Sequence, residues 1–191
     1  RILVADDSLL LKSNRGNIWD SRKVVSDQSI HIRYNGKKLL PAKTYYWKVT
    51  VWDNQNQSAV SPVSSWQMGL MSEQDWRGAT WIGYEEIPDS LVVVPAEHQR
   101  GPKKWAGVND VLPLLRTTVD IRKPIKKATA FVCGLGHFEL SANGKKIGDH
   151  FLDPGWTKYD KEAQYVAFDV TQNLRPGSNA LGVMLGNGFY F

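Results

Sequence analysis

Short runs of apolar and β-branched residues recur along this chain, with glycine, proline, asparagine and aspartate between them. Hardly any window shows a sustained helical period, so the pattern predicts an all-β fold. The alternation is clearest in Thr44–Trp52, where every second side chain points to the same face of a strand. Of the two faces, we expect the one carrying Tyr45, Trp47, Val49 and Val51 to pack against the core.

The first part of the chain has the spacing of a small sandwich. Asn35–Gly36 is a signal for a type I′ hairpin turn. Several short strands over about 70 residues predict an immunoglobulin-like or fibronectin III-like β-sandwich for residues 1–70. The strands we expect there are Arg1–Ala5, Ile18–Ser26, Ser29–Tyr34, Thr44–Trp52 and Ser65–Gly69.

A boundary follows at Leu70–Gly78, where the alternation stops and acidic residues gather. Residues 71–191 are predicted to form a second, jelly-roll-like (galactose-binding-like) β-sandwich. Its proline-rich stretch 85–113 reads as an irregular insertion, and Asp169–Leu174 reads as a helical or 3₁₀ turn. The strands we expect are Leu114–Ile121, Lys127–Cys133, His137–Ala142, Lys146–Gly148, Gln164–Asp169 and Asn179–Gly186.

Both ends of the sequence lie inside apolar segments. Arg1–Ala5 already reads as a strand, and Gly186–Phe191 stops within an aromatic run. We therefore expect the first sandwich to be truncated at its N-terminal side and the second at its C-terminal side. A piece from the interior of a longer protein cannot show an N-terminal signal, so the sequence leaves the compartment open.

The net charge of +5 does not indicate a polyanionic partner, because the basic residues come as separated pairs. No nucleic-acid motif and no membrane span accompanies them, so we expect a solvated surface and neither a nucleic-acid nor a membrane partner. The single Cys133 excludes an intrachain disulfide and a cysteine-based zinc site. The histidines show no metal-ligand spacing. The basic pairs are Lys37–Lys38, Lys103–Lys104, Lys126–Lys127 and Lys145–Lys146.

Three turn segments are candidates for ligand contacts, each with a structural alternative. Asn143–Gly144 is a two-residue hairpin turn, and its asparagine amide could also address sugar hydroxyls at the rim of the sandwich. Asp153–Trp156 is a rigid bend whose indole could either cap the core or form a platform for a pyranose. Asn187, between two glycines, marks either a bulge or a backbone that a ligand approaches closely.

Catalysis by this chain alone is not predicted. Glycoside hydrolysis needs two carboxyl groups, about 6.5–9.5 Å apart for inversion and about 5–5.5 Å apart for retention. The carboxyl groups available in the second half fit turns or exposed strand positions, and no helical barrel is present to hold a pair. These groups are Asp149, Asp153, Asp160 and Glu162.

The motifs of the second half follow a specific order: N-G-K-K-I-G-D, L-D-P-G-W-T-K-Y-D-K, Y-V-A-F-D-V-T and N-A-L-G-V-M-L-G-N-G-F-Y. This order closely resembles the N-terminal β-sandwich domain of bacterial α-L-rhamnosidases. Upstream, I-W-D-S-R-K-V-V-S-D-Q-S and Y-Y-W-K-V-T-V-W-D resemble the Ig-like domain that precedes it, and W-R-G-A-T-W-I-G resembles the junction. The resemblance covers nearly the whole chain, apart from the stretch around 85–111.

The resemblance implies an inverting glycoside hydrolase that removes terminal α-L-rhamnose. In such a protein the acid and base lie on a separate (α/α)₆ barrel, which packs beside the second sandwich. A degrader of plant polysaccharides would favour a periplasmic or extracellular location. Two other functions stay open: a rhamnose-binding module, and a structural or adhesion pair whose Ig-like half meets a protein partner.

In some relatives a similar sandwich binds rhamnose together with a calcium ion. By motif, the resemblance assigns the sugar contacts to Asn143, Trp156 and Asn187. Calcium binders of this type have an acidic residue just before the turn asparagine, whereas this chain has Ala142. We therefore expect no cofactor, since a calcium ion needs carboxylate and carbonyl oxygens.

Overall fold

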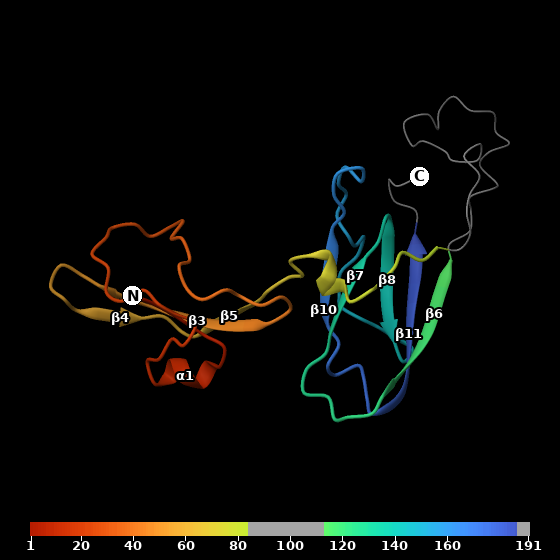
Figure 1. Cartoon of the computed structure of the whole chain (residues 1–191), viewed down its shortest axis with the longest axis horizontal. Coiled ribbons are helices and arrows are strands. Elements are labelled where there is room, and N and C mark those ends of the chain that lie inside the picture. Colours follow the sequence, from red (N-terminus) through yellow and green to blue (C-terminus); the bar gives the residue numbers. More distant parts are fainter. Residues whose placement is uncertain (84–112, 187–191) are drawn as a thin grey trace. The chain divides into compact units, whose positions relative to one another are not determined.

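The computed structural model describes residues 1–83 and 113–186. It divides into two compact units, Arg1–Ala79 and Thr80–Phe191 (Figure 1). Strands dominate both units, which confirms the all-β prediction. Nearly all of the insertion expected at 85–113 lies outside the described residues. Within the described part, no helix has both the length and the apolar character needed to cross a membrane.

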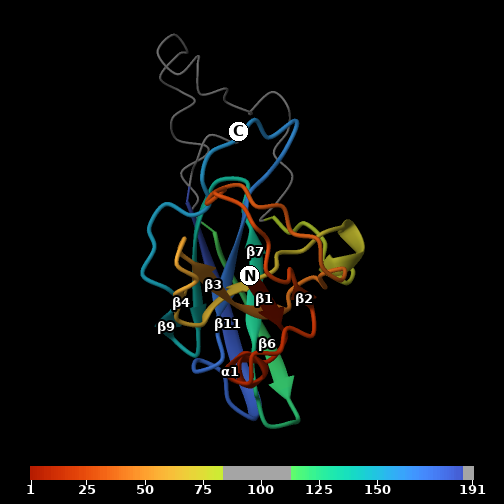
Figure 2. The same cartoon turned by 90° about the vertical axis from the view of Figure 1, so that its left-hand side faces the viewer.

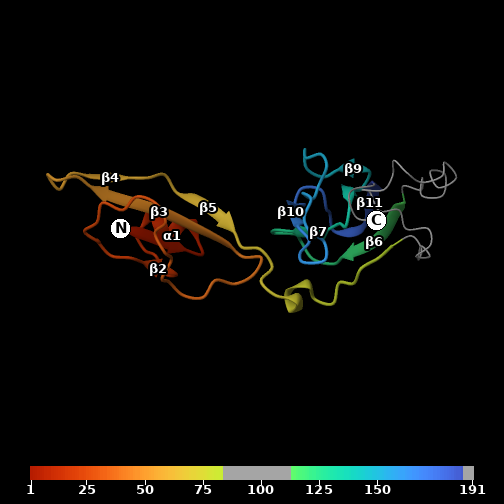
Figure 3. The ribbon, with the colours of Figure 1, turned by 90° about the horizontal axis from the view of Figure 1, so that it is seen from above.

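The first unit is built on one antiparallel sheet in the order β2-β1-β3-β4, with β5 also paired to β3. The long strand β3 is central: β5 pairs with its first half and β4 with its last residues (Figure 3). The strands expected at the N-terminus, at 44–52 and at 65–69 are confirmed, with shifted ends. The bounds are β1 Ile2–Ala5, β2 Trp19–Asp20, β3 Thr44–Trp52, β4 Ser58–Val60 and β5 Ser64–Gln67.

The sequence analysis missed the helix α1, Ser8–Lys12. Asp7 caps its first turn, because the side-chain Oδ1 accepts from the Leu9 backbone N–H at 2.8 Å. Leu11 is fully buried and packs against Leu3 and Ala5 of β1. A helix of this length shows too little of the helical period to stand out, so only the aspartate before the leucines signalled it. A 3₁₀ helix, Glu73–Trp76, follows β5.

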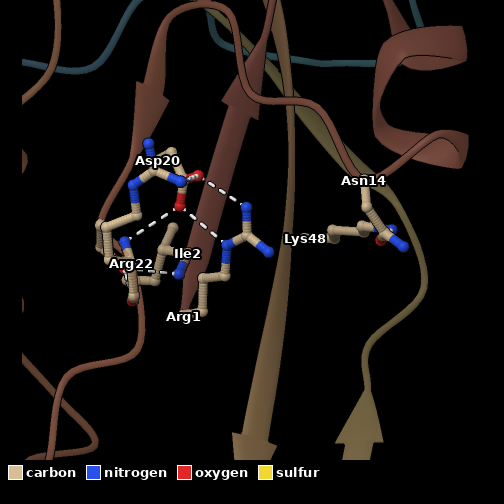
Figure 4. Close-up of polar contacts among 7 residues, drawn as sticks. Arg1, Ile2, Asn14, Asp20, Arg22 and Lys48 are labelled. Carbon is tan, nitrogen blue, oxygen red and sulfur yellow. Dashed lines mark hydrogen bonds and ion pairs between the residues drawn. The ribbon is translucent and has the colours of Figure 1, made fainter.

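The face prediction for β3 is wrong in part. Tyr45 is buried as expected, but Val51 on the same face is 57% exposed, while Lys48 on the opposite face is only 7% exposed. The reason is the register, which places Lys48 opposite Leu3 on the face that α1 covers. The Lys48 ammonium donates to Asn14 Oδ1 at 2.6 Å, so this buried charge has a polar partner (Figure 4).

The strands expected at Ile18–Ser26 and Ser29–Tyr34 are wrong except for Trp19–Asp20. Asp20 turns the chain away from the sheet, because its Oδ1 accepts the backbone N–H of Arg22 at 2.9 Å and Arg22 has φ 59°. Arg1 holds the same carboxylate with two side-chain hydrogen bonds, at 2.8 and 2.6 Å (Figure 4). The chain returns to a strand only at β3.

The second unit has two antiparallel sheets, β6-β11-β8-β9 and β10-β7. Figure 2 shows β6 and β11, which pair along eight residues from Gly177↔Ile121 to Met184↔Leu114. The expected strands of this half are confirmed, although β9 ends before Gly148, whose φ is 73°. The bounds are β6 Leu114–Ile121, β7 Thr129–Cys133, β8 His137–Ala142, β9 Lys145–Lys146, β10 Tyr165–Asp169 and β11 Gly177–Gly186.

The core of the second unit lies between these two sheets. Phe138, Leu140 and Ala142 alternate along β8 and point inward, where they meet Phe168 and Val170. The rings of Phe138 and Phe168 meet edge to face at 6.2 Å between centroids. Side chains of β7 and β11 complete the layer. Inward faces from two sheets that share one core define a β-sandwich, as predicted.

The segment expected to form a helical or 3₁₀ turn after β10 is a single hydrogen-bonded turn. The backbone N–H of Asn173 donates to the Val170 carbonyl at 3.0 Å. Cys133, at the end of β7, is half-buried, and burial raises the pKa of its thiol. The Cys133 Sγ lies 3.2 Å from the Gln164 carbonyl, to which it donates.

Candidate carbohydrate-binding site

The Asn143–Gly144 pair forms the hairpin turn that the sequence predicts. It connects β8 to β9, with φ values of 51° and 78° at its two residues. Both values lie in the left-handed region that a type I′ turn requires. Glycine reaches this region without strain, and asparagine is one of the few other residues that enter it readily.

The side chain of Asn143 makes three hydrogen bonds to other residues of the same unit. Its Nδ2 donates to the Asn173 carbonyl at 2.9 Å and to Asn179 Oδ1 at 3.0 Å. Its Oδ1 accepts the backbone N–H of Ala180 at 3.0 Å. Both amide hydrogens are therefore committed, and a sugar hydroxyl could reach only the remaining lone pair of the oxygen.

Asn179 is the buried centre of this hydrogen-bond network. It is 0% exposed, and its Oδ1 accepts from Asn143 and from the Arg175 backbone N–H. Its Nδ2 donates to the carbonyls of Arg175 and Gly177, at 2.7 and 2.9 Å. The amide of Asn179 thus ties the β8–β9 turn to the segment that leads into β11.

Trp156 lies in the long loop between β9 and β10. The loop is anchored at Asp153, whose carbonyl accepts the backbone N–H of Phe138 at 2.9 Å. The next residue, Pro154, is buried. Trp156 is 70% exposed, which contradicts the alternative that its indole caps the core.

Two further large apolar side chains are exposed in this loop: Phe151 and Leu152. Leu152 has φ 61°, a conformation that is strained for a residue of this type. The Lys146 ammonium lies 3.9 Å from the ring centroid of Phe151 and 2.7 Å from Glu139 Oε1. We call Phe151, Leu152 and Trp156 the apolar loop.

Sequence reasoning missed Phe151 and Leu152. Their signal was present, since two large apolar residues directly precede the D-P-G-W bend in a segment otherwise rich in turn residues.

A polar group without a partner lies close to the anchor of the apolar loop. The Nδ1 of His137, next to Phe138, is buried and has no hydrogen-bond partner among the described residues. A buried ring nitrogen of this kind normally has a partner.

The structure does not bring the predicted sugar contacts together. Asn143 directly follows the last residue of β8, whereas the anchor of the apolar loop pairs with Phe138, near the first residue of β8. Asn143 and Trp156 therefore lie toward opposite ends of that strand. Gly186 pairs with His137 at the Trp156 end, but Asn187, which follows it, lies outside the described residues.

The four candidate carboxyl groups all lie in the loop between β9 and β10. Asp153 Oδ2 is 3.1 Å from His150 Nδ1, and Asp160 Oδ2 is 3.5 Å from the Lys158 ammonium. The side chain of Asp149 is fully exposed. Asp149 and Asp160 are exposed and Asp153 lies against a histidine, so this geometry does not describe a buried pair of carboxyl groups that shares a proton.

Four other carboxyl groups have lowered pKa values because hydrogen-bond donors stabilise their charged forms. The Arg1 guanidinium lowers the pKa of Asp20 to about 2. Donors from Lys43, from the Met71 backbone and from Thr171 lower the pKa values of Asp6, Asp75 and Asp169, respectively.

The residues around Asn143 do not fit a calcium ion. Ala142 is buried and offers no side-chain oxygen, and Asn143 Oδ1 already accepts a backbone N–H. Among residues 1–83 and 113–186, no cluster of three histidine, cysteine, aspartate or glutamate side chains could hold a metal. The donor set at this turn therefore gives calcium no carboxylate.

These observations define a class: a unit built on one antiparallel sheet, followed by a β-sandwich that exposes an apolar loop. Residues 1–72 match the family described as "Rha78A-like, N-terminal immunoglobulin domain". Residues 123–191 match the family described as "Alpha-L-rhamnosidase N-terminal domain". The chain therefore matches the N-terminal region of alpha-L-rhamnosidases, as the order of its motifs predicts.

Individual proteins agree with this assignment. An alpha-L-rhamnosidase of Formosa agariphila is 40% identical over 99% of this chain, which covers 20% of that relative. The structure of an alpha-L-rhamnosidase from Dictyoglumus thermophilum matches 99% of this chain and 21% of its own, with 39% identity and a TM-score of 0.81. The structure of an alpha-L-rhamnosidase from Aspergillus terreus shares the fold. It matches 86% of this chain and 18% of its own, with 22% identity and a TM-score of 0.67. The chain thus spans about a fifth of the length of these relatives.

Proposed function

We propose that this chain is the noncatalytic N-terminal part of an α-L-rhamnosidase, a glycoside hydrolase that releases terminal α-L-rhamnose. Its two β-domains support a catalytic (α/α)₆ barrel located elsewhere in the protein. One observation carries the proposal: both domains match N-terminal rhamnosidase domains, and together they span about a fifth of the relatives.

The carboxyl groups of the described residues support the same assignment. An inverting hydrolase needs a general acid whose pKa is raised, so that it keeps its proton near neutral pH. Every shift resolved for an aspartate here is downward, which favours the charged form instead. Such carboxylates stabilise turns and ion pairs and are poor proton donors.

A direct test is rhamnose release from an aryl α-L-rhamnoside by the chain of 191 residues. The alpha-L-rhamnosidase of Formosa agariphila serves as the positive control under the same conditions. We expect no release above the uncatalysed rate at any pH from about 4 to 8, the range in which carboxyl acids and bases operate. Turnover by the chain alone would refute the noncatalytic assignment.

We propose a second function for the apolar loop, the binding of a rhamnose-containing saccharide. The exposed indole of Trp156 offers a flat apolar surface, and Phe151 and Leu152 of the same loop are exposed as well. A 6-deoxy sugar carries a methyl group and C–H faces that stack on such a surface with little loss of conformational entropy. Because both amide hydrogens of Asn143 are committed, Trp156 is the stronger of the two predicted contacts within the described residues.

This second function is tested by titrating the chain with L-rhamnose and following tryptophan fluorescence or NMR chemical shifts. We expect Trp156→Ala to abolish binding, while Trp81→Ala, which removes another exposed indole, leaves it unchanged. We expect the same affinity in calcium and in EGTA, because no carboxylate cluster is present among the described residues. Equal losses in both tryptophan variants would argue against the assignment.

A further inference from the structure

The positive charge of the chain is concentrated in one segment. Residues 22–38 contain five basic residues and only one acidic residue, so they carry +4 of the net charge of +5. In the rest of the chain, acidic residues nearly balance the basic ones. The basic residues of the segment are Arg22, Lys23, Arg33, Lys37 and Lys38, and the acidic one is Asp27.

The same segment exposes large aliphatic side chains. Val24, Val25, Ile30 and Ile32 all lie at the surface, and Val25 is 97% exposed. Single exposed aliphatic residues are common, but four within nine residues are unusual. The segment therefore combines exposed apolar side chains with positive charge.

The backbone of this segment is open as well. The part of the structure that is described contains no hydrogen bond from the backbone N–H groups of Lys23–Ser26 to any acceptor, and none to their carbonyl oxygens. Positive φ values occur at Arg22 and His31 but at no residue between them. The Gln28 side chain closes the turn that follows, because its Nε2 donates to the Ile30 carbonyl at 2.9 Å. Lys23–Ser26, which we call the open leg, thus has the unpaired polar groups of an edge strand.

We propose that the open leg binds an extended, acidic segment of a partner protein, which adds to it as a β-strand. Val24 and Val25 have high β propensity and face opposite sides of an extended chain, so each contacts one row of the partner's side chains. Carboxylates of the partner face Arg33, Lys37 and Lys38. This inference concerns the first unit and does not depend on the proposed rhamnosidase context.

Other occupants fit these observations less well. A second copy of the chain would bring two segments of charge +4 together. A lipid bilayer would bury backbone N–H groups that have no partner, which is costly in hydrocarbon. A saccharide would find aliphatic side chains instead of the aromatic platforms that stack on sugar rings. An extended peptide satisfies the backbone, the aliphatic side chains and the charge together.

The probe is a synthetic peptide of eight alternating glutamate and valine residues with blocked ends. We expect it to bind the chain with a dissociation constant of about 100 µM, since hydrogen bonds, apolar contacts and opposite charges contribute together. Hydrogen exchange of the Lys23–Ser26 amides should be nearly unprotected in the free chain and about tenfold slower at saturating peptide. A lysine–valine peptide and a glutamate–valine peptide N-methylated at alternate residues should bind at least about tenfold more weakly.

Matched variants locate the site on the protein. Val25→Ser should weaken binding about threefold, whereas Val51→Ser, at another exposed valine of the first unit, should not change it. Lys38→Glu should weaken binding by a similar factor, while Lys145→Glu, the same charge reversal in the second unit, should have no effect. All four side chains are exposed, so the variants retain the fold.

Several results would overturn the proposal. One is the absence of binding up to about 1 mM peptide, and another is equal binding of the N-methylated peptide. Protection of the Lys23–Ser26 amides in the free chain would mean that the edge is already paired. Two further results would assign the open leg to another occupant, provided that Val25→Ser abolished them. Binding to vesicles of phosphatidylcholine and phosphatidylglycerol at a ratio of about 3:1 would assign it to lipid. Dimerisation would assign it to a second copy of the chain.

Discussion

Substitution of Asn179 by alanine should destabilise the second unit more than most single changes in it. The side chain is fully buried and makes four hydrogen bonds. Alanine leaves one amide hydrogen of Asn143, the Arg175 N–H and the carbonyls of Arg175 and Gly177 without this partner. Each buried polar group that loses its partner costs about 1–3 kcal/mol, although water reaches part of the vacated space. We therefore expect a loss of about 3 kcal/mol in the free energy of unfolding.

The assay is urea denaturation followed by far-UV circular dichroism, with thermal unfolding as a second measurement. A loss of about 3 kcal/mol corresponds to a decrease of about 10–15 °C in the Tm of a domain of this size. Asn173→Ala is the matched control, since Asn173 contributes only its backbone carbonyl to the network and alanine retains that group. The control should cost less than about 0.5 kcal/mol. If Asn179→Ala is no more destabilising than Asn173→Ala, the network does not hold this end of the sandwich.

Three further predictions concern single residues. Asn143→Gly keeps the positive φ of the turn but removes three side-chain hydrogen bonds, so it should cost about 1–2 kcal/mol in urea denaturation; no loss would show that the amide is dispensable. Leu11→Ala should cost about 2–4 kcal/mol in the same assay, because its side chain is fully buried, and a loss below about 1 kcal/mol would contradict the packing of α1. Asp20, whose pKa is lowered from 3.8 to about 2 by Arg1, adds stability that is present above pH 4 and is lost as the pH falls toward 2. Asp20→Asn should therefore lower stability at pH 6 by about 1–2 kcal/mol and remove that part of the acid dependence, and an unchanged pH profile would refute the ion pair.

The alternation of apolar and polar residues predicted most strands, because alternate side chains of a strand point to the same face and the sheets bury the apolar face. It located every described strand of the second unit to within a few residues, including β8 with its three inward side chains. It failed at residues 21–34, where β-branched residues are frequent but no neighbouring strand among the described residues pairs with them. Strand propensity alone cannot distinguish a paired strand from an open one, because pairing depends on residues distant in the sequence.

The role of Asn143 shows a similar limit for the candidate site. Sequence identified its turn correctly, because the Asn–Gly pair dictates the backbone locally. The partners of its side chain come from positions 30 and more residues away. Spacing along the chain could not show that these partners converge on the amide. The exposure of Val51 and the burial of Lys48 have the same origin, since α1 covers a face that the strand pattern alone leaves undecided.

The residues at the two ends of β8 therefore differ in what they contribute to the domain. At the Asn143 end, side-chain amides satisfy one another and the backbone of the turns, so substitutions there should change stability before they change binding. At the Phe138 end, a strained leucine and two aromatic rings are held at the surface, although burying them would be more favourable for the isolated domain. A fold that keeps apolar side chains exposed on an anchored loop gains nothing in stability from doing so. Because its exposed residues add little to the folding of the unit, the apolar loop is where the saccharide binding proposed above can be tested with the least effect on stability.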